Sequence, residues 1–157
     1  MDKTLIILMG VQGSGKSTFY HARLATGFVR VNLDTLKTRN REQLLVEECL
    51  MEGKSYAIDN TNPTRLDRER YIPAAKAAGY RIVGYFFEPQ VEDCLRRNAG
   101  REGKARVPDI AIYSTVKRLE PPSLDEGFDE LFLVRNDDKE MSVKPWQDAH
   151  SHTGEDF

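Results

Sequence analysis

Cysteine is scarce in this chain of 157 residues, which contains only Cys49 and Cys94. Two thiols in a chain of this length exclude a disulfide scaffold, and their spacing excludes a cysteine-based metal site. We expect both to be reduced, packed thiols of a cytoplasmic protein. Histidine is also scarce. The one His-x-His pair, His150 and His152, lies in a polar segment, where solvated side chains are more common than metal ligands.

Long hydrophobic runs are missing as well. The apolar run at residues 5–9 is too short for a signal-peptide core or a membrane-spanning helix, and a glycine-rich loop follows it directly. This run therefore predicts a buried strand, and we expect no membrane contact. Positive charge is not in excess either, since 23 Lys and Arg oppose 25 Asp and Glu for a net charge of −2. Any nucleic-acid contact must then come from a local basic groove.

The composition that remains is ordinary for a globular domain, with 39% hydrophobic and 31% charged residues, and the length favours a single domain. Apolar runs predict strands at 4–9, 28–33, 55–59, 81–87 and 130–134. Helical spacing predicts helices at 16–26, 41–52, 64–78, 90–98 and 108–119. This alternation is typical of an α/β fold, in which helices cover both faces of a parallel sheet of about five strands.

Local signals mark some of the boundaries. Asn62-Pro63 predicts the start of the helix at 64–78, with Pro63 near its first turn, and Gly79 predicts its end. We expect the folded domain to span residues 1–135. Residues 136–157 are polar and acidic, and they predict a partly disordered tail in which Trp146 docks on the core.

Residues 10–17, Gly-Val-Gln-Gly-Ser-Gly-Lys-Ser, fit the pattern G-x-x-x-x-G-K-[ST] at every fixed position. A predicted strand precedes this loop and a predicted helix follows it, as a phosphate-binding P-loop requires. The glycines let backbone N–H groups converge on phosphates, and the helix adds the positive end of its dipole. We expect the loop to bind ATP, or another nucleoside triphosphate, through Gly10, Gln12, Gly13, Ser14, Gly15, Lys16, Ser17 and Thr18.

Within this loop, Lys16 is expected to contact the β- and γ-phosphates, and the Ser17 hydroxyl is expected to hold Mg²⁺. A P-loop alone does not name a reaction, because motors, switches and kinases all use one. The chain is short, and no GTPase switch segment is evident between Lys16 and Asp59. A small kinase with the P-loop NTPase type of fold is therefore the prediction.

Asp34 follows the predicted second strand. The carboxyl ends of neighbouring parallel strands open into one crevice, so a carboxylate there could take the proton from an acceptor hydroxyl. Asp34 could equally be the N-cap of the next helix. Lys37, one helical turn later, could neutralise an anionic acceptor or be a solvated surface charge.

Asp59 closes the predicted third strand, beside the P-loop strand. A carboxylate at this place can hold Mg²⁺ directly or through water. The alternative is an Asx turn that leads into the following helix. We favour the metal role, because the polar run at 59–63 lies where the sheet should face the nucleotide.

A basic, glycine-containing segment at 98–107 breaks the helical pattern and predicts a mobile lid. An arginine in such a lid can stabilise the charge that develops on a transferred phosphoryl group. A solvated basic loop is the alternative. The cations in and around the segment are Arg96, Arg97, Arg101, Lys104 and Arg106.

The ordered motifs of the chain resemble the 5′-hydroxyl polynucleotide kinase family, in particular its kinase domains joined to a phosphatase. These motifs are Gly-Ser-Gly-Lys-Ser-Thr, Val-Asn-Leu-Asp-Thr-Leu, Ala-Ile-Asp-Asn-Thr-Asn-Pro, Arg-Arg-Asn-Ala-Gly-Arg and Val-Pro-Asp-Ile-Ala-Ile-Tyr. The P-loop is shared by many proteins, whereas its combination with the later motifs is far more specific. The resemblance covers about residues 4–135.

The resemblance implies a role for each matching residue. Asp34 matches the general base that activates the 5′-hydroxyl, and Asp59 matches the acidic residue that supports the metal. Arg101 matches a lid arginine on the transferring phosphate, and Arg97 matches a lid position close to the nucleotide. Two positions depart from the family pattern. Leu33 replaces a frequent arginine before the base, and Lys37 replaces an arginine that could grip a phosphate with two hydrogen bonds.

The resulting hypothesis is a kinase that uses ATP and Mg²⁺ to phosphorylate the 5′-hydroxyl end of DNA or RNA. Its catalytic residues would be Asp34, Lys16 and Arg101, with Asp34 and Lys37 at the acceptor. The alternatives are a P-loop kinase for a small molecule, such as a sugar, an antibiotic or a nucleotide sugar, and a non-catalytic ATP-binding module. The sequence suggests no obligate protein partner.

Overall fold

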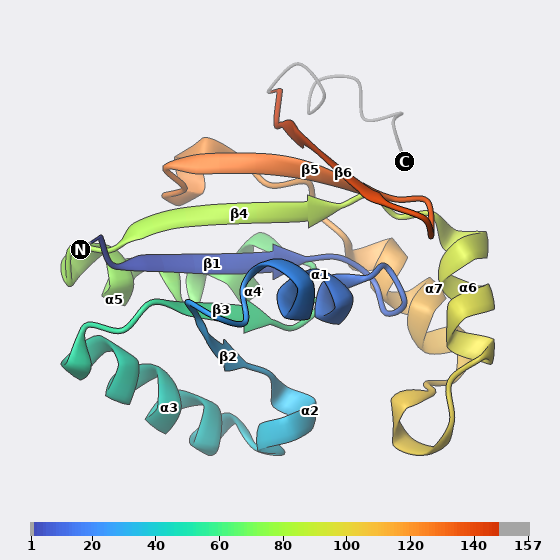
Figure 1. The fold of residues 1–157 in the computed structure, drawn as a ribbon, viewed down its shortest axis with the longest axis horizontal. Coiled ribbons are helices and arrows are strands. Elements are labelled where there is room, and N and C mark those ends of the chain that lie inside the picture. Colours follow the sequence, from blue (N-terminus) through green and yellow to red (C-terminus); the bar gives the residue numbers. More distant parts are fainter. Residues whose placement is uncertain (1, 148–157) are drawn as a thin grey trace.

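The computed structural model describes residues 2–147, in which one sheet of six strands has the order β2-β3-β1-β4-β5-β6 (Figure 1). Strands β1 to β5 are parallel to their neighbours, and β6 runs antiparallel to β5. The parallel α/β fold predicted from the sequence is thus confirmed, with one additional strand. The strands are β1 Thr4–Met9, β2 Val29–Val31, β3 Tyr56–Asp59, β4 Arg81–Phe87, β5 Glu130–Asn136 and β6 Met141–Pro145.

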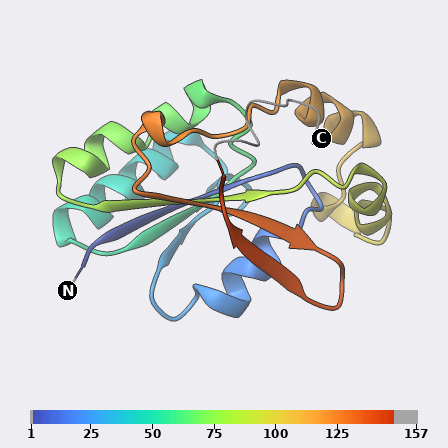
Figure 2. The same ribbon diagram turned by 90° about the horizontal axis from the view of Figure 1, so that it is seen from above.

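Helices cover both faces of the sheet, and two further helices lie beyond the carboxyl ends of its central strands (Figures 1 and 2). Helix α1 (Lys16–Arg23) packs on one face. Helices α3 (Arg39–Glu52), α4 (Arg65–Glu69) and α5 (Ile72–Ala77) pack on the other. The helices beyond the strand ends are α6 (Val91–Ala99) and α7 (Asp109–Arg118). The short elements are α2 (Leu33–Leu36) and the 3₁₀ turns η1 (Gly103–Ala105) and η2 (Leu124–Glu126).

Strand β1 lies at the centre of the sheet and is buried on both faces, which explains its unbroken apolar sequence. Its register aligns Leu8 with Asp59 on β3 and Met9 with Phe86 on β4. This alignment places the P-loop, the end of β3 and the end of β4 at the same edge of the sheet. No helix within residues 2–147 is long and apolar enough to cross a membrane.

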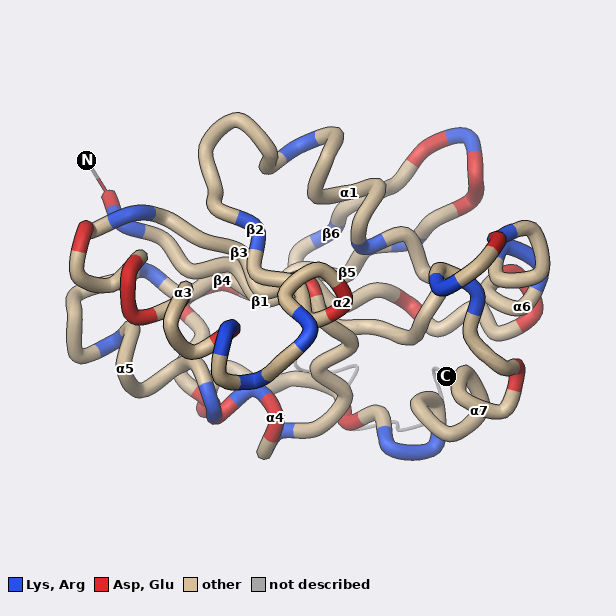
Figure 3. The backbone as a smooth tube through the Cα atoms, turned by 90° about the horizontal axis from the view of Figure 1, so that it is seen from below, with Lys and Arg blue, Asp and Glu red and all other residues tan. Residues whose placement is uncertain are grey.

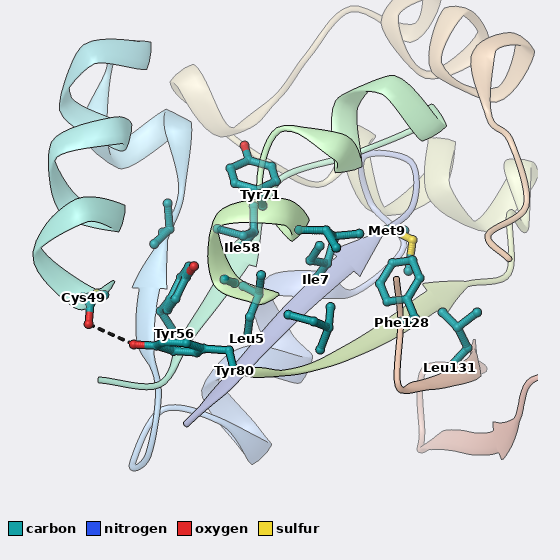
Figure 4. Packing of buried hydrophobic residues seen from close by; sticks show 14 of the residues in the cluster. Leu5, Ile7, Met9, Cys49, Tyr56, Ile58, Tyr71, Tyr80, Phe128 and Leu131 are labelled. Atoms are coloured by element: carbon teal, nitrogen blue, oxygen red, sulfur yellow. Dashed lines mark hydrogen bonds between the residues drawn. The ribbon is translucent and has the colours of Figure 1, made fainter. Parts of the chain in front are cut away.

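The larger core cluster fills the space between the sheet and the α3–α5 layer (Figure 4). At the end far from the P-loop, Tyr80 donates its hydroxyl to the backbone oxygen of Cys49 at 3.0 Å, which links α5's end to α3. Both cysteines are buried and form no disulfide, as expected. Burial raises the pKa of the Cys94 thiol, which favours the unreactive protonated form.

The helix predicted at 64–78 is two helices. Thr64 and Asp67 form a capping box at the start of α4, and α4 ends at Glu69. Pro73 then lies in the first turn of α5, where a proline is well tolerated. Pro63 directly precedes the N-cap Thr64 and so lies near the first turn of α4, as expected. Gly79 ends the segment with a φ of +84°, as predicted.

The sequence also did not predict the strand in the C-terminal segment. Residues 141–145 form β6 and are not a disordered tail, so the sheet extends past residue 135. Trp146 does pack on the core, with its ring 5.4 Å from that of Phe86. The strand escaped detection because it lies at an edge, where its side chains are at least partly exposed and leave no apolar run. His150 and His152 lie outside the described residues.

Candidate active site

The P-loop runs from β1 into α1, and neighbouring backbone packs tightly against it. Gly13 has a φ of +83°, and a Cβ at this position would lie 2.7 Å from the backbone oxygen of Cys94 on α6. Gly15 has a φ of +103°, and a Cβ there would lie 2.6 Å from the side chain of Asn136 on β5. Both positions therefore favour glycine for conformation, and Gly13 also requires it for space, because the clashing atom belongs to the backbone. Asn136 also donates to the backbone oxygen of Ser14 at 3.2 Å.

Lys16 lies inside the loop that it belongs to. Its ammonium donates to the backbone oxygens of Gly10 at 2.8 Å and Val11 at 2.9 Å, with the Ser14 hydroxyl 3.5 Å away. Burial lowers the pKa of Lys16 to about 8, although the carboxylate of Asp59 acts in the opposite direction. A bound triphosphate would replace these carbonyls with stronger anionic acceptors.

Ser17, Asp59 and Arg30 form a compact polar group beside the loop. The Ser17 hydroxyl donates to Asp59 Oδ2 at 3.0 Å. Arg30 on β2 donates through Nε to Asp59 Oδ2 at 2.9 Å, and through Nη2 to Ser17 Oγ at 2.9 Å. Asp59 is 2% exposed, so its charge is balanced mainly by Arg30.

This group fits the proposed Mg²⁺ site by its chemistry. A hydroxyl and a carboxylate are hard oxygen donors, and they are already close enough together to share a small cation with the phosphates of a nucleotide. The guanidinium of Arg30 donates to both oxygens and would have to move if a metal ion were to bind them. Within residues 2–147, no cluster of three or more His, Cys, Asp or Glu side chains is placed to hold a metal ion by itself.

A cavity of about 280 Å³, called here the Asp34 cavity, brings together most of the residues predicted for catalysis. Its walls come from the P-loop, the ends of β2 and β3, and the segment at 98–107. The lining residues include Gln12, Gly13, Gly15, Lys16, Ser17, Asp34, Asp59, Arg101 and Lys104. Asp34 is exposed in the first turn of α2.

The N-cap alternative for Asp34 was wrong. Asn32 caps α2 by accepting from the backbone N–H of Thr35 at 3.1 Å, and Thr38 caps α3. Lys37 ends α2 with a φ of +78°, is exposed and does not line the Asp34 cavity. The structure thus brings Asp34 to the P-loop but leaves Lys37 outside the cavity.

A second cavity of about 360 Å³ adjoins the P-loop on the side of the β5–β6 turn, and we call it the hairpin cavity. It is lined by Gly13, Gly15, Thr18, Phe19, Ala22, Arg23, Arg97, Arg101 and residues 138–141 with Asn136. Arg101 lines both cavities, so it stands between them. Figure 3 shows basic positions around α6 and the segment that follows it, with acidic positions among them.

Arg97 joins the P-loop to the β5–β6 turn. It donates to the backbone oxygen of Gly13 at 2.9 Å and to Asp138 Oδ1 at 2.9 Å. Arg96 pairs with the other oxygen of Asp138 at 2.7 Å. The two arginines lower the pKa of Asp138, with Arg97 the larger influence. The sequence placed Arg97 close to the nucleotide, and in the structure it contacts the loop itself.

Hydrogen bonds join the polar run at 59–63 to β1 and to the start of the P-loop. The backbone N–H of Gly10 donates to Thr61 at 2.9 Å, and Asn62, with a φ of +44°, donates to Leu8 at 2.8 Å. Arg68 is fully buried and donates to the backbone oxygens of Asn62 and Pro63. It also forms a bidentate pair with Glu126, at 2.7 and 2.9 Å.

Several supporting residues escaped the sequence reasoning, namely Arg30, Glu42, Asn60 and Arg68. Arg30 lies within a strand, where one charge usually marks an exposed position. Glu42 and Arg68 occur in helices rich in charge, so their burial has no local signal. Asn60 stands next to Asp59, and the polar composition of the run at 59–63 was the available clue.

Comparison with known proteins supports the resemblance stated from the sequence. The chain is 34% identical over 128 residues to the bifunctional polynucleotide phosphatase/kinase of Schizosaccharomyces pombe, covering 79% of this chain and 31% of that protein. It is 32% identical over 139 residues to a putative protein of the same name from Acanthamoeba polyphaga mimivirus, covering 84% of this chain and 33% of that protein. The chain thus spans about a third of the length of these relatives.

Solved structures share the fold. A fungal RNA kinase superposes with a TM-score of 0.65 at 14% identity, over 85% of this chain and 38% of that one. A gluconokinase from Sinorhizobium meliloti superposes with a TM-score of 0.57 at 19% identity, over 84% of this chain and 82% of that one. A family model described as an AAA domain matches residues 37–122, more than half of the sequence. With its P-loop, parallel sheet and Asp59 beside Ser17, this chain belongs to the AAA domain family AAA_33.

Proposed function

We propose that this chain is a kinase that transfers the γ-phosphate of ATP to the 5′-hydroxyl of a DNA or RNA strand. The observation that carries the proposal is the Asp34 cavity, in which Lys16, Asp34 and Arg101 line one space. Catalysis of phosphoryl transfer depends mainly on positioning and on charge stabilisation. These three side chains offer a proton acceptor and two cations in that space.

On the donor side, the P-loop amides and the N-terminus of α1 bind the phosphates. Lys16 exchanges its backbone acceptors for phosphate oxygens. Ser17 and Asp59 would hold Mg²⁺, which neutralises charge on the β- and γ-phosphates when bound. The hairpin cavity, on the far side of Gly13 and Gly15, has room for the nucleoside.

On the acceptor side, Asp34 accepts the proton of the attacking hydroxyl. The hydroxyl oxygen forms a bond to the γ-phosphorus while the bond to the β–γ bridging oxygen breaks, and ADP leaves with that oxygen. Arg101 and Lys16 stabilise the charge that spreads over the transferred group. Transfer is direct, with no covalent enzyme intermediate.

The relatives support this choice of acceptor, because two of them carry polynucleotide phosphatase/kinase in their names at 34% and 32% identity. A small-molecule kinase is the second candidate. The gluconokinase likeness and the modest volume of about 280 Å³ in the Asp34 cavity favour it. An ATP-binding module without transfer is the third candidate, and the exposed carboxylate of Asp34 in that cavity speaks against it.

The test is transfer of labelled γ-phosphate to a 5′-hydroxyl oligonucleotide, run beside a 5′-phosphorylated oligonucleotide and gluconate. We expect label on the 5′-hydroxyl strand alone, with DNA and RNA strands of equal length compared directly. Label on gluconate and not on the strands would favour the second candidate. Tight ATP binding without label on any acceptor would favour the third.

A further inference from the structure

Two asparagines join the ends of β2 and β3 by a reciprocal exchange of hydrogen bonds. Asn32 Nδ2 donates to the backbone oxygen of Asp59 at 2.6 Å. Asn60 Oδ1 accepts from the backbone N–H of Leu33 at 3.0 Å. Leu33 directly precedes Asp34, and Asp59 directly precedes Asn60. The exchange therefore connects the backbone next to Asp34 with the backbone next to Asp59, the two carboxylates of the Asp34 cavity.

Asn60 is itself held from behind by a buried carboxylate. Its Nδ2 donates to Glu42 Oε2 at 2.9 Å. Glu42 is 2% exposed, and its other oxygen accepts from Tyr71 at 3.0 Å and from Arg39 at 2.8 Å. An ionised carboxylate only accepts hydrogen bonds, so it fixes which end of the Asn60 amide carries the nitrogen. The amide oxygen is then turned toward Leu33.

The helix that carries Asp34 has little else to hold it. Helix α2 is four residues long and contains no buried residue, although Leu36 packs partly against the core. So short a helix has no stability of its own. The side chains of Asn32 and Asn60 add direct restraints on the backbone of its first turn.

We propose that Asn60, oriented by Glu42, is a positioning residue for phosphoryl transfer. It fixes the first turn of α2 and so holds Asp34 at a constant distance from the P-loop and from Asp59. This inference rests on the proposed function, in which Asp34 accepts the proton of the acceptor hydroxyl. Asn60 touches neither reacting oxygen in this role and acts through the backbone of Leu33.

The first experiment compares Asn60→Ala with the unaltered chain by amide hydrogen exchange and by kinetics. We expect exchange at the Leu33 amide to rise at least about tenfold, because its acceptor is gone. A displacement of Asp34 by about 1 Å should lower kcat with a 5′-hydroxyl strand by about 10- to 100-fold. The Kd for ATP should stay within about twofold, because the P-loop amides are not altered.

A matched pair of tyrosines separates positioning from general stability. Tyr71→Phe removes a hydroxyl that donates to Glu42, whereas Tyr80→Phe removes one that donates to the backbone oxygens of Cys49 and Lys54. Both hydroxyls belong to buried tyrosines of the same core cluster. We expect similar losses of Tm, but slower transfer for Tyr71→Phe alone. This pair also carries the test if Asn60→Ala does not fold.

The possible outcomes are distinct. If the unaltered chain labels a 5′-hydroxyl strand and Asn60→Ala labels it at the same rate, the positioning role is overturned and the proposed function stands. Unchanged Leu33 exchange in Asn60→Ala, or equal kcat losses in the two tyrosine variants, overturns it as well. If the unaltered chain labels no strand, the proposed function fails, and faster Leu33 exchange still establishes the restraint on α2.

Discussion

The two halves of the Asp34 cavity are built in different ways. In the proposed function the donor half is the P-loop, against which Cys94 and Asn136 pack and which Arg97 connects to the β5–β6 turn. The proposed acceptor half is the first turn of α2, where Asp34 is exposed and side-chain hydrogen bonds restrain the backbone. A rigid donor site suits a ligand that is the same in every turnover. In the proposed function the acceptor site is fixed by a few side-chain hydrogen bonds, so the identity of the acceptor rests on few residues.

The largest expected effect separates the two halves directly. Asp34→Asn removes the proton acceptor and should lower kcat by about 10²- to 10⁴-fold, while the Kd for ATP stays unchanged. Lys16→Met removes a charge-assisted contact to the phosphates and should raise the Kd for ATP by about 10- to 100-fold. Calorimetry measures the Kd for ATP of the two variants, and single-turnover assays measure their rate of phosphoryl transfer. A weaker affinity for ATP in Asp34→Asn would show that the halves are not separable.

The second effect tests the rigidity of the donor half. Gly13→Ala places a Cβ against the backbone oxygen of Cys94 and should cost about 1–3 kcal/mol in ATP binding or in folding. Gly103→Ala is the matched control. It also lies at positive φ, but nothing comes within 4 Å of a Cβ added there, and it belongs to the segment at 98–107. Titration with ATP and thermal unfolding compare the pair. Equal losses for the two variants would contradict the role of the Cys94 contact.

The third effect concerns Arg30, the cation that contacts both Ser17 and Asp59. Arg30 donates hydrogen bonds to both Asp59 and Ser17, so a Mg²⁺ ion held by these two residues would compete with its guanidinium. Arg30 is 25% exposed, which weakens its pair with Asp59, and Arg30→Met should raise the affinity for Mg²⁺ in the ADP complex by about fivefold. Manganese binding followed by paramagnetic resonance provides a readout other than activity. A lower affinity in Arg30→Met would mean that the guanidinium assists the metal.

The smallest effect tests the tie between the donor half and the β5–β6 turn. Asp138 has a lowered pKa because of Arg97 and Arg96, so its contribution to stability is present above the ordinary Asp pKa of about 3.9. It should be lost as the pH falls through the lower pKa of the folded state. Asp138→Asn tolerates the same positive φ and serves as the reference. The difference in Tm between the two chains should shrink from pH 7 to pH 3, and a constant difference would contradict this.

The sequence predicted the elements that are buried and contiguous. The bounds of β1 and β4 match because each strand is a mainly apolar, mostly buried run, and the P-loop was recognised because its glycines recur at fixed spacing. The sequence could not show that Arg30 contacts Asp59, because that contact joins β2 to β3, two strands separated in the chain by helices α2 and α3. It also missed β6, whose pairing with β5 compensates for a sequence without an apolar face. Long-range contacts between polar groups leave no periodic signal in a single chain.

The antiparallel strand β6 has a consequence for how the molecule behaves in a crowded solution. It ends in Lys144 and Pro145, both exposed, at one edge of the sheet, and β2 at the opposite edge is three residues long. A charged ammonium and a residue without an N–H discourage another chain from adding a strand there. Neither edge offers a long template for fibril growth.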